Sequence, residues 1–332
     1  MQNNQFTEER IPTSPPQILP LDNDTIRPLW SVMIPVYNGM QYLQSTLESI
    51  LMQDQGLDKM QIEVIDDCST DGDVAELVYK VSKGRINYFK QEKNKGLLRN
   101  TETCINRARG FYVHILHADD QIKEGFYKEI DTLFNQFPEI GAAFTDHEHM
   151  DSFGNPVWDS EKISKHCGVY DNFILTIAKK CVIQYCSIVV KRATYEKLGC
   201  FYGFESGEDW LMWVRIAANY PIAYSPKVLA KYRVLHMNTT SISLTSGQNL
   251  KDKLKGIDMI QEYVPLEYRK QIKKESKKIV AIYYTQMVDK LYHDNHNKIA
   301  AISLAHQALK LDFNVNTLFT VIKIHIKSLI NY

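Results

Sequence analysis

The sequence predicts an α/β fold with a mostly parallel sheet flanked by helices, followed by an all-helical C-terminal region. From Trp30 onward, short apolar runs alternate with stretches of helical periodicity, and crossovers of this length join parallel strands. From about Ser246 the apolar residues recur only at helical spacing. With 44% hydrophobic and 23% charged residues, the 332-residue chain can bury a core large enough for one main domain and an appendage.

Short apolar runs predict the strands of the sheet, and apolar residues at helical spacing predict the helices between them. Ser31–Ile34 is a short buried strand, and the helix after it has a single apolar face. That face carries residues spaced four, three and one apart: Leu43, Leu47, Ile50 and Leu51. The alternation continues with strands at Gln61–Ile65, Ile86–Phe89 and Tyr112–Leu116 and helices at Asp73–Val81 and Asn100–Ala108. Because ligands bind at the carboxyl ends of strands in such sheets, the residues that follow each strand are candidates for a site.

Composition divides the chain into three regions. Residues 1–29 hold five of the eleven prolines among Asn, Gln and Asp, without a strand or helix pattern, which predicts a mobile Pro-rich N-terminal arm. Residues 30–245 form the predicted α/β domain, and residues 246–332 form a helical, basic C-terminal region. Its helices are predicted at Leu250–Tyr263, Leu266–His293, Lys298–Leu309 and Val315–Ile330.

The charge of the chain is balanced overall and uneven along its length. The 39 basic and 39 acidic residues cancel, so no overall field recruits nucleic acid, and no nucleic-acid partner is expected. Residues 247–332 hold 14 Lys and Arg against 8 Asp and Glu, which leaves 25 against 31 in the rest. Arg269-Lys270, Lys273-Lys274 and Lys277-Lys278 recur every four residues and form a cationic stripe on a helix. This stripe is either exposed only to solvent or forms a peripheral binding surface for an anionic membrane, a lipid-linked acceptor or a partner.

The cysteines and the hydropathy indicate a cytoplasmic protein. The six cysteines contain no Cys-x-x-Cys pair, and the chain begins without a charged segment followed by an apolar one. No window reaches the roughly 18 continuous apolar residues that a membrane-spanning helix requires. Any membrane contact is therefore expected to be peripheral, at the inner face.

Three pairs of acidic residues are candidates for chemistry. Asp66-Asp67 closes a strand and can accept hydrogen bonds from a base or ribose, or serve as a turn and helix cap. Asp119-Asp120 closes another strand as a like-charge pair, which favours a bound divalent metal over a solvated loop. Glu208-Asp209 opens a helix, where acids either offset the helix dipole or act as a general base.

Two histidines invite a zinc hypothesis that the sequence does not favour. His147-Glu148-His149 places two imidazoles on one side of a strand, but no third ligand with suitable spacing is evident.

Five segments in order resemble family 2 glycosyltransferases. They are residues 31–38 (SVMIPVYN), residues 64–72 (VIDDCSTDG), residues 94–97 (NKGL), Ala108-Arg109-Gly110 with Asp119-Asp120, and residues 207–210 (GEDW). The resemblance covers roughly residues 30–240 and implies a GT-A fold whose sheet binds a nucleotide. It also implies inversion at the anomeric carbon of a nucleotide sugar.

The resemblance implies a role for each matching residue. Pro35, Tyr37, Asp66 and Asp67 would line the base and ribose pocket, and Asn94, Gly96 and Arg99 would lie in the loop over the nucleotide. Asp119 would contact the ribose or sugar, and Asp120 would hold Mg²⁺ or Mn²⁺ on the diphosphate. Asp209 would be the catalytic base, with Glu208 as its neighbour. His236, after Tyr232-Arg233, would contact the metal or the diphosphate.

Two positions depart from the family pattern. His117 stands where many members carry the first acid of a DxD signature, and Cys68 stands where glycine is frequent. From the resemblance we expect a metal-dependent inverting glycosyltransferase. Its expected donor is a nucleoside-diphosphate sugar, with UDP as the expected nucleotide. Its expected acceptor is a carbohydrate or a lipid-linked molecule in polysaccharide or glycolipid assembly. The alternatives are a non-catalytic sugar-nucleotide-binding subunit and a metal-dependent nucleotidyltransferase.

Overall fold

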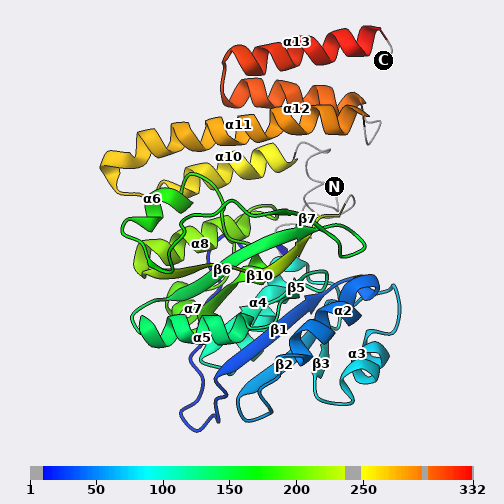
Figure 1. Ribbon diagram of the computed structural model, residues 1–332, viewed down its shortest axis with the longest axis vertical. Helices are drawn as coiled ribbons and strands as arrows, with labels where there is room; N and C mark the ends of the chain where they lie inside the picture. Colours follow the sequence, from blue (N-terminus) through cyan, green and yellow to red (C-terminus); the bar gives the residue numbers. More distant parts are fainter. Residues whose placement is uncertain (1–9, 236–247, 294–297, 331–332) are drawn as a thin grey trace. The chain divides into compact units, whose positions relative to one another are not determined.

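A computed structural model describes residues 10–235, 248–293 and 298–330 (Figure 1). The chain divides into two compact units. Unit 1 comprises Met1–Phe173 and Val182–Val234, and unit 2 comprises Ile174–Cys181 and Leu235–Tyr332. The boundary expected at residue 245 from the sequence falls within residues 236–247, outside the described part of the chain.

Unit 1 is built on one mixed sheet. Among the described residues its strand order is β3-β2-β1-β4-β9-β6-β10-β5, with β7 paired to β6 and β8 to β10. Parallel pairing joins β3, β2, β1 and β4 as the sequence predicts, and β6 and β10 are also parallel. The strands are β1 (Trp30–Val36), β2 (Met60–Asp66), β3 (Asn87–Lys90), β4 (Tyr112–Ile115), β5 (Gln121–Ile122), β6 (Ala142–Met150), β7 (Pro156–Asp159), β8 (Gly168–Val169), β9 (Ile188–Lys191) and β10 (Ile222–Arg233).

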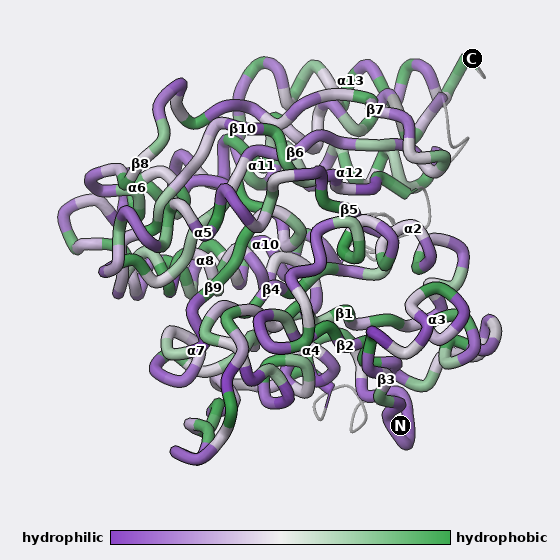
Figure 2. The backbone as a smooth tube through the Cα atoms, turned by 60° about the horizontal axis from the view of Figure 1, so that its bottom comes forward, coloured by the Kyte–Doolittle hydropathy of each residue, from purple (hydrophilic) through white to green (hydrophobic). Residues whose placement is uncertain are grey.

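Helices pack on this sheet and supply its core. They are α2 (Met40–Leu51), α3 (Val74–Ser82), α4 (Leu97–Arg107), α5 (Phe126–Gln136), α7 (Arg192–Leu198) and α8 (Glu208–Asn219), with a short 3-10 turn η1 (Tyr185–Ser187). β1, whose residues are mostly hydrophobic (Figure 2), is buried along its whole length. It packs with the apolar face of α2, where Leu47 is fully buried, and truncation of such a core leucine typically costs about 2–5 kcal/mol.

The described part of the segment assigned to a mobile arm is packed on unit 1. Ile18 is fully buried, and the carbonyl oxygens of Pro12 and Pro16 accept hydrogen bonds from the backbone N–H groups of Gly203 (2.9 Å) and Cys200 (2.8 Å). A proline-rich segment makes no regular element, so its carbonyl groups are available to such partners. From Arg10 onward the segment is therefore part of the unit rather than a free arm.

Unit 2 is helical, close to the predicted boundaries. It contains α10 (Gln248–Ile260), the 3-10 turn η2 (Leu266–Tyr268), α11 (Arg269–His293), α12 (Lys298–Leu311) and α13 (Val315–Leu329), and α6 (Phe173–Ile177) begins at the unit boundary. The helices α10 to α13 stack side by side (Figure 1). None of the described helices is both long enough and apolar enough to cross a membrane.

Candidate active site

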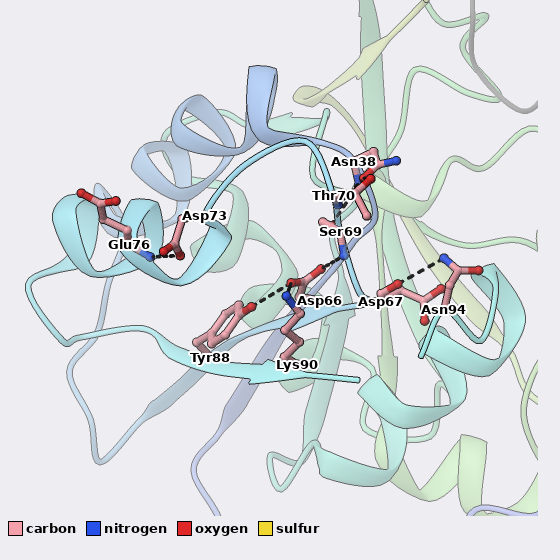
Figure 3. A network of polar contacts seen from close by, with 10 residues as sticks. All are labelled: Asn38, Asp66, Asp67, Ser69, Thr70, Asp73, Glu76, Tyr88, Lys90 and Asn94. Atoms are coloured by element: carbon pink, nitrogen blue, oxygen red, sulfur yellow. Dashed lines mark hydrogen bonds and ion pairs between the residues drawn. The ribbon is translucent and has the colours of Figure 1, made fainter. Parts of the chain in front are cut away.

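Loops at the carboxyl ends of β1 and β2 are tied together by side-chain hydrogen bonds (Figure 3). Asn38 accepts a bond from the Thr70 backbone N–H at 2.8 Å, and its own N–H donates to Ser69 Oγ at 3.0 Å. Cys68 adopts a left-handed backbone with φ of 66°. This conformation costs a non-glycine residue roughly 1–2 kcal/mol, which explains why glycine suits this position.

Asp66 is committed to the fold of this corner. Its carboxylate is fully buried and accepts hydrogen bonds from the Tyr88 hydroxyl at 2.7 Å and the Ser69 N–H at 2.8 Å, while Lys90 Nζ lies 4.0 Å away. Figure 3 shows the Asp66 and Asp67 side chains directed to different neighbours, as consecutive residues of an extended chain must be. Only Asp67 is therefore directed toward the loop that follows β3.

Asp67 holds that loop, residues 94–96, by both oxygens of its carboxylate. Oδ1 accepts from the Lys95 N–H at 2.7 Å and Oδ2 from the Gly96 N–H at 2.8 Å, and the Asp67 carbonyl accepts from Asn94 Nδ2 at 3.1 Å. Burial raises the pKa of Asp67, whereas the two backbone donors and the charge of Arg10 lower it. The carboxylate thus fixes the loop that the sequence assigns to the nucleotide.

Arg10 closes the outer side of the 94–96 loop. Its Nη2 donates to Asn94 Oδ1 at 2.6 Å. Gly96 has φ of 86°, and a Cβ there would lie 2.8 Å from Arg10 Nε, so the close approach requires glycine. The sequence did not single out Arg10, because a charged residue in a proline-rich segment carries no local signal for a contact with residue 94.

The other predicted nucleotide-side residues differ in exposure. Pro35 is buried within β1, whereas the Tyr37 side chain just after this strand is 53% exposed. Arg99, in the first turn of α4, forms an ion pair with Glu102 at 2.7 Å. Tyr37 is therefore the aromatic ring of this group that is accessible for stacking.

A turn at the carboxyl end of β4, residues 117–120, carries the candidate metal ligands. His117, Asp119 and Asp120 each offer a ligand atom, and these atoms lie within 4.8 Å of one another. The turn closes with a hydrogen bond from the Asp120 N–H to the His117 carbonyl at 3.1 Å. Thr46 Oγ1 of α2 lies 2.7 Å from the Asp120 carbonyl and 2.8 Å from that of Ala118.

Asp120 is held from β10 and is almost fully buried. Its exposed fraction is 1%, and Oδ1 accepts from the Arg233 N–H at 2.9 Å, while Arg233 Nε donates to the Asp119 carbonyl at 2.8 Å. Burial raises the pKa of Asp120 well above its usual range, and the charge of Asp119 raises it further. A cation bound between two adjacent carboxylates, here the buried Asp120 and the half-buried Asp119, would stabilise both.

His117 belongs to this cluster, although the sequence identified it only as a replacement for an acid. Its Nε2 is buried without a hydrogen-bond partner among the described residues, and its ring lies tilted against that of Tyr185, with the centroids 4.4 Å apart. Burial lowers the pKa of His117. The spacing His-x-Asp-Asp was the signal that could have identified it as a third ligand.

The two acids that open α8 occupy different surroundings. Glu208 is buried and accepts a hydrogen bond from the Tyr185 hydroxyl at 3.3 Å. Asp209 is half-buried, and its charge acts on His117 and on Tyr232, whose pKa is raised by burial and by the charges of Asp120, Asp119 and Asp209. Asp209 therefore lies near the 117–120 turn, whereas Glu208 is bonded to Tyr185.

Three other histidines, His147, His149 and His236, are candidate metal ligands from the sequence. His236 lies outside the described residues. His147 and His149 lie with their rings 5.0 Å apart, and His149 stacks on Trp158 at 4.5 Å. Neither belongs to the one group of possible metal ligands found among the described residues.

A sheet with parallel strands and acidic residues clustered after the carboxyl end of β4 is the arrangement in which α/β proteins bind ligands. The model of the family described as "Glycosyl transferase family 2" matches residues 31–196. The chain belongs to this family, and its fold is GT-A, which confirms the family and fold predicted from the sequence.

Similar proteins extend this comparison. A putative teichuronic acid biosynthesis glycosyltransferase, TuaG of Bacillus subtilis, is 27% identical over 221 residues, which cover 65% of this chain and 82% of TuaG. An uncharacterized glycosyltransferase of Rickettsia felis is 30% identical over 209 residues, covering 61% of this chain but only 33% of that protein. The chain therefore matches about a third of the length of this longer relative.

A solved structure gives the same fold. The crystal structure of Staphylococcus aureus TarS residues 1–349 in complex with UDP-GlcNAc superposes with a TM-score of 0.63 at 15% identity, covering 90% of this chain and 91% of that one. The likeness extends beyond the family match into the C-terminal helices and concerns the fold alone.

Proposed function

We propose that this chain is an inverting glycosyltransferase that transfers a hexose-type sugar from a UDP-linked donor to an acceptor hydroxyl. The observation that carries the proposal is the convergence of His117, Asp119 and Asp120 at the end of β4, with the charge of Asp209 acting on the same cluster. The similarity to TuaG supports a carbohydrate or lipid-linked acceptor in surface polysaccharide assembly.

The residues of the 117–120 turn fit a divalent metal. Asp120 and Asp119 would hold Mg²⁺ or Mn²⁺, which when bound neutralises charge on the diphosphate leaving group. Burial and the charge of Asp119 both raise the pKa of Asp120, and a cation would offset this repulsion between the two carboxylates. His236 stays a prediction as a further contact to the metal or diphosphate.

Asp209 is the proposed general base. Its carboxylate takes the proton from the acceptor hydroxyl while the acceptor oxygen bonds to the anomeric carbon. The bond between that carbon and the diphosphate oxygen breaks on the opposite face, so the configuration inverts. Glu208 is better suited to position Tyr185, because it is buried and bonded to that hydroxyl.

The proposed nucleotide subsite lies between Tyr37 and the 94–96 loop. Tyr37 offers an exposed aromatic face, and Asp67 can accept from a base N–H while it holds the loop. The neighbour TarS was solved with UDP-GlcNAc, which supports a uridine donor. Pro35, Asp66, Asn94, Gly96 and Arg99 remain the other predicted nucleotide-side residues.

The experiment that tests the function is a screen of nucleotide sugars for hydrolysis with and without a chelator. We expect release of UDP from at least one UDP-sugar, lost when the metal is removed and lost in Asp120→Asn. Binding of nucleotide sugars without any turnover on candidate acceptors or water would instead support the non-catalytic subunit. Membership of the family argues against a nucleotidyltransferase.

Unit 2 supports a second, finer proposal, a peripheral contact with an anionic membrane at its inner face. Lys270, Lys274 and Lys278 are exposed and four residues apart on α11, so they form one row. Each basic residue near an anionic bilayer is worth about 1 kcal/mol. Vesicles with anionic lipid should co-sediment the protein at low salt, and exchange of all three lysines for glutamate should abolish this. Equal sedimentation of the wild type and the triple variant would refute the contact.

A further inference from the structure

We propose that His117 is a ligand of the divalent cation and that its imidazole makes the site prefer a first-row transition-metal dication, Mn²⁺, over Mg²⁺. The inference rests on the metal-dependent function proposed above and specifies which metal this particular chain selects. It concerns a position where this chain carries an imidazole in place of the carboxylate that the family pattern favours.

The geometry of the turn supports three ligands. Ligand atoms of His117, Asp119 and Asp120 come within 4.8 Å of one another, a spread that one cation can bridge. The hydrogen bond from the Asp120 N–H to the His117 carbonyl folds the turn so that both ends face the same space. Contacts from Thr46 and Arg233 hold the turn from neighbouring elements, so the spacing does not depend on the histidine itself.

The state of the imidazole also fits a ligand. Nε2 of His117 is buried and has no hydrogen-bond partner among the described residues, and a buried polar atom in this state costs free energy unless a partner is supplied. The Tyr185 ring, 4.4 Å away, fixes the plane of the imidazole.

The donor set determines the metal preference. Mg²⁺ is a hard cation that favours oxygen ligands in a strict octahedron, whereas imidazole suits first-row transition metals. A carboxylate at residue 117 would give three oxygen ligands and one more negative charge, which suits Mg²⁺ better. The exchange of that carboxylate for an imidazole therefore lowers the affinity for Mg²⁺ more than the affinity for Mn²⁺.

The test measures metal binding to the full-length protein without turnover. Calorimetry with MnCl₂ and MgCl₂, each with and without UDP, gives the two affinities, and pulsed electron paramagnetic resonance of the Mn²⁺ complex detects nitrogen coupling from a coordinated imidazole. We expect the wild type to bind Mn²⁺ at least tenfold more tightly than Mg²⁺ and to show the nitrogen signal. His117→Asp should remove the signal and reduce the preference at least tenfold.

Two further variants make the result interpretable. His117→Ala should weaken Mn²⁺ binding at least tenfold while thermal unfolding shows a folded protein, and His166→Ala, an exposed histidine of the same unit, should change nothing. Mn²⁺ binding without nitrogen coupling, or an unchanged preference in His117→Asp, would overturn the role of His117 and leave the glycosyltransferase proposal intact. Full donor turnover in excess chelator, with no Mn²⁺ bound even beside UDP, would overturn the metal dependence of the proposed function as well.

Discussion

Substitution of Asp67 should destabilise the fold as well as weaken nucleotide binding. Its two carboxylate oxygens accept the backbone N–H groups of Lys95 and Gly96 at 2.7 and 2.8 Å, and its side chain is 2% exposed. Asp67→Ala leaves both donors without an acceptor, at about 1–3 kcal/mol for each buried donor. The cost of burying the carboxylate disappears at the same time and offsets part of the loss. We therefore expect the free energy of unfolding to fall by about 2–4 kcal/mol.

Urea unfolding followed by circular dichroism, with UDP affinity from calorimetry, measures the two effects separately. Asp73→Ala is the matched control, because Asp73 accepts one exposed N–H, that of Glu76 at 2.9 Å, as the cap of α3. Loss of such a cap typically costs about 1 kcal/mol. If Asp67→Ala unfolds no more easily than Asp73→Ala, the two bonds to the 94–96 loop do not stabilise the fold and the reasoning is wrong.

The pH dependence provides an independent check on Asp67. Burial raises its folded pKa above 3.8, so the folded chain binds more protons than the unfolded chain between the two pKa values. The contribution of Asp67 to the free energy of unfolding therefore decreases as the pH rises from about 3.8 through the folded pKa. Asp67→Asn cannot titrate and should lack this decrease. An identical pH profile for wild type and variant would contradict the raised pKa.

The other predictions concern the acids and a core histidine. Asp209→Asn should lower kcat about 10²–10⁴-fold with nucleotide affinity retained. Glu208→Gln should lower kcat less than about tenfold, because the Oε1 of glutamine can still accept a hydrogen bond from Tyr185. If Glu208→Gln loses more activity than Asp209→Asn, the roles of the two residues must be exchanged. Asp120→Asn should remove metal binding in calorimetry. It should also keep or raise the melting temperature of the metal-free protein, because it removes a buried charge of the same sign as that of Asp119. A lower melting temperature would contradict this. His114 of β4 is fully buried, with its ring nitrogens 3.2 Å from the Tyr127 hydroxyl and the Cys186 carbonyl. Burial lowers its pKa to about 3, so the stabilising effect of the neutral ring is present above about pH 6.5 and is lost as the pH falls, by about 2 kcal/mol between pH 7 and pH 5. Unfolding titrations should show a smaller loss in His114→Gln, and equal losses would refute it.

Much of unit 1 is readable from local sequence periodicity. The predicted helix at Asp73–Val81 forms at Val74–Ser82, and the predicted strand at Gln61–Ile65 lies within Met60–Asp66. Each of these segments has its own apolar pattern and its own end signal, such as the Asp73 cap. Local patterns of this kind determine the type of element without reference to the rest of the chain.

Pairing between distant strands could not be read in the same way. β9, Ile188–Lys191, lies antiparallel between β4 and β6, and its four residues carry no information about either partner. The packing of Ile18 and the bond from Arg10 to Asn94 likewise join residues far apart in sequence. Such contacts depend on the assembled surface, which a proline-rich composition does not describe.

The site shows the same division between local and distant information. The sequence predicts the strand ends and the acids that follow them. It does not predict that Asp66 and Asp67 contact different neighbours, because that depends on the alternation of side chains at the end of β2 and on where the 94–96 loop lies. His117 was missed because its value as a ligand depends on the folding of the 117–120 turn. In sequence it is only a residue that differs from a motif.

The 117–120 turn is held in place by contacts from two other elements. Thr46 contacts its carbonyl groups from α2, and Arg233 donates to Asp120 and Asp119 from β10. Arg233 Nη1 also donates to the Asp151 carbonyl at 2.9 Å, beyond β6, so one side chain joins the turn to a second strand end. A turn fixed in this way would lose little conformational entropy on binding the proposed cation, which would favour binding. In the proposed cation site, Arg233 would therefore position the ligands, because its backbone N–H donates to Asp120 and its Nε donates to the Asp119 carbonyl.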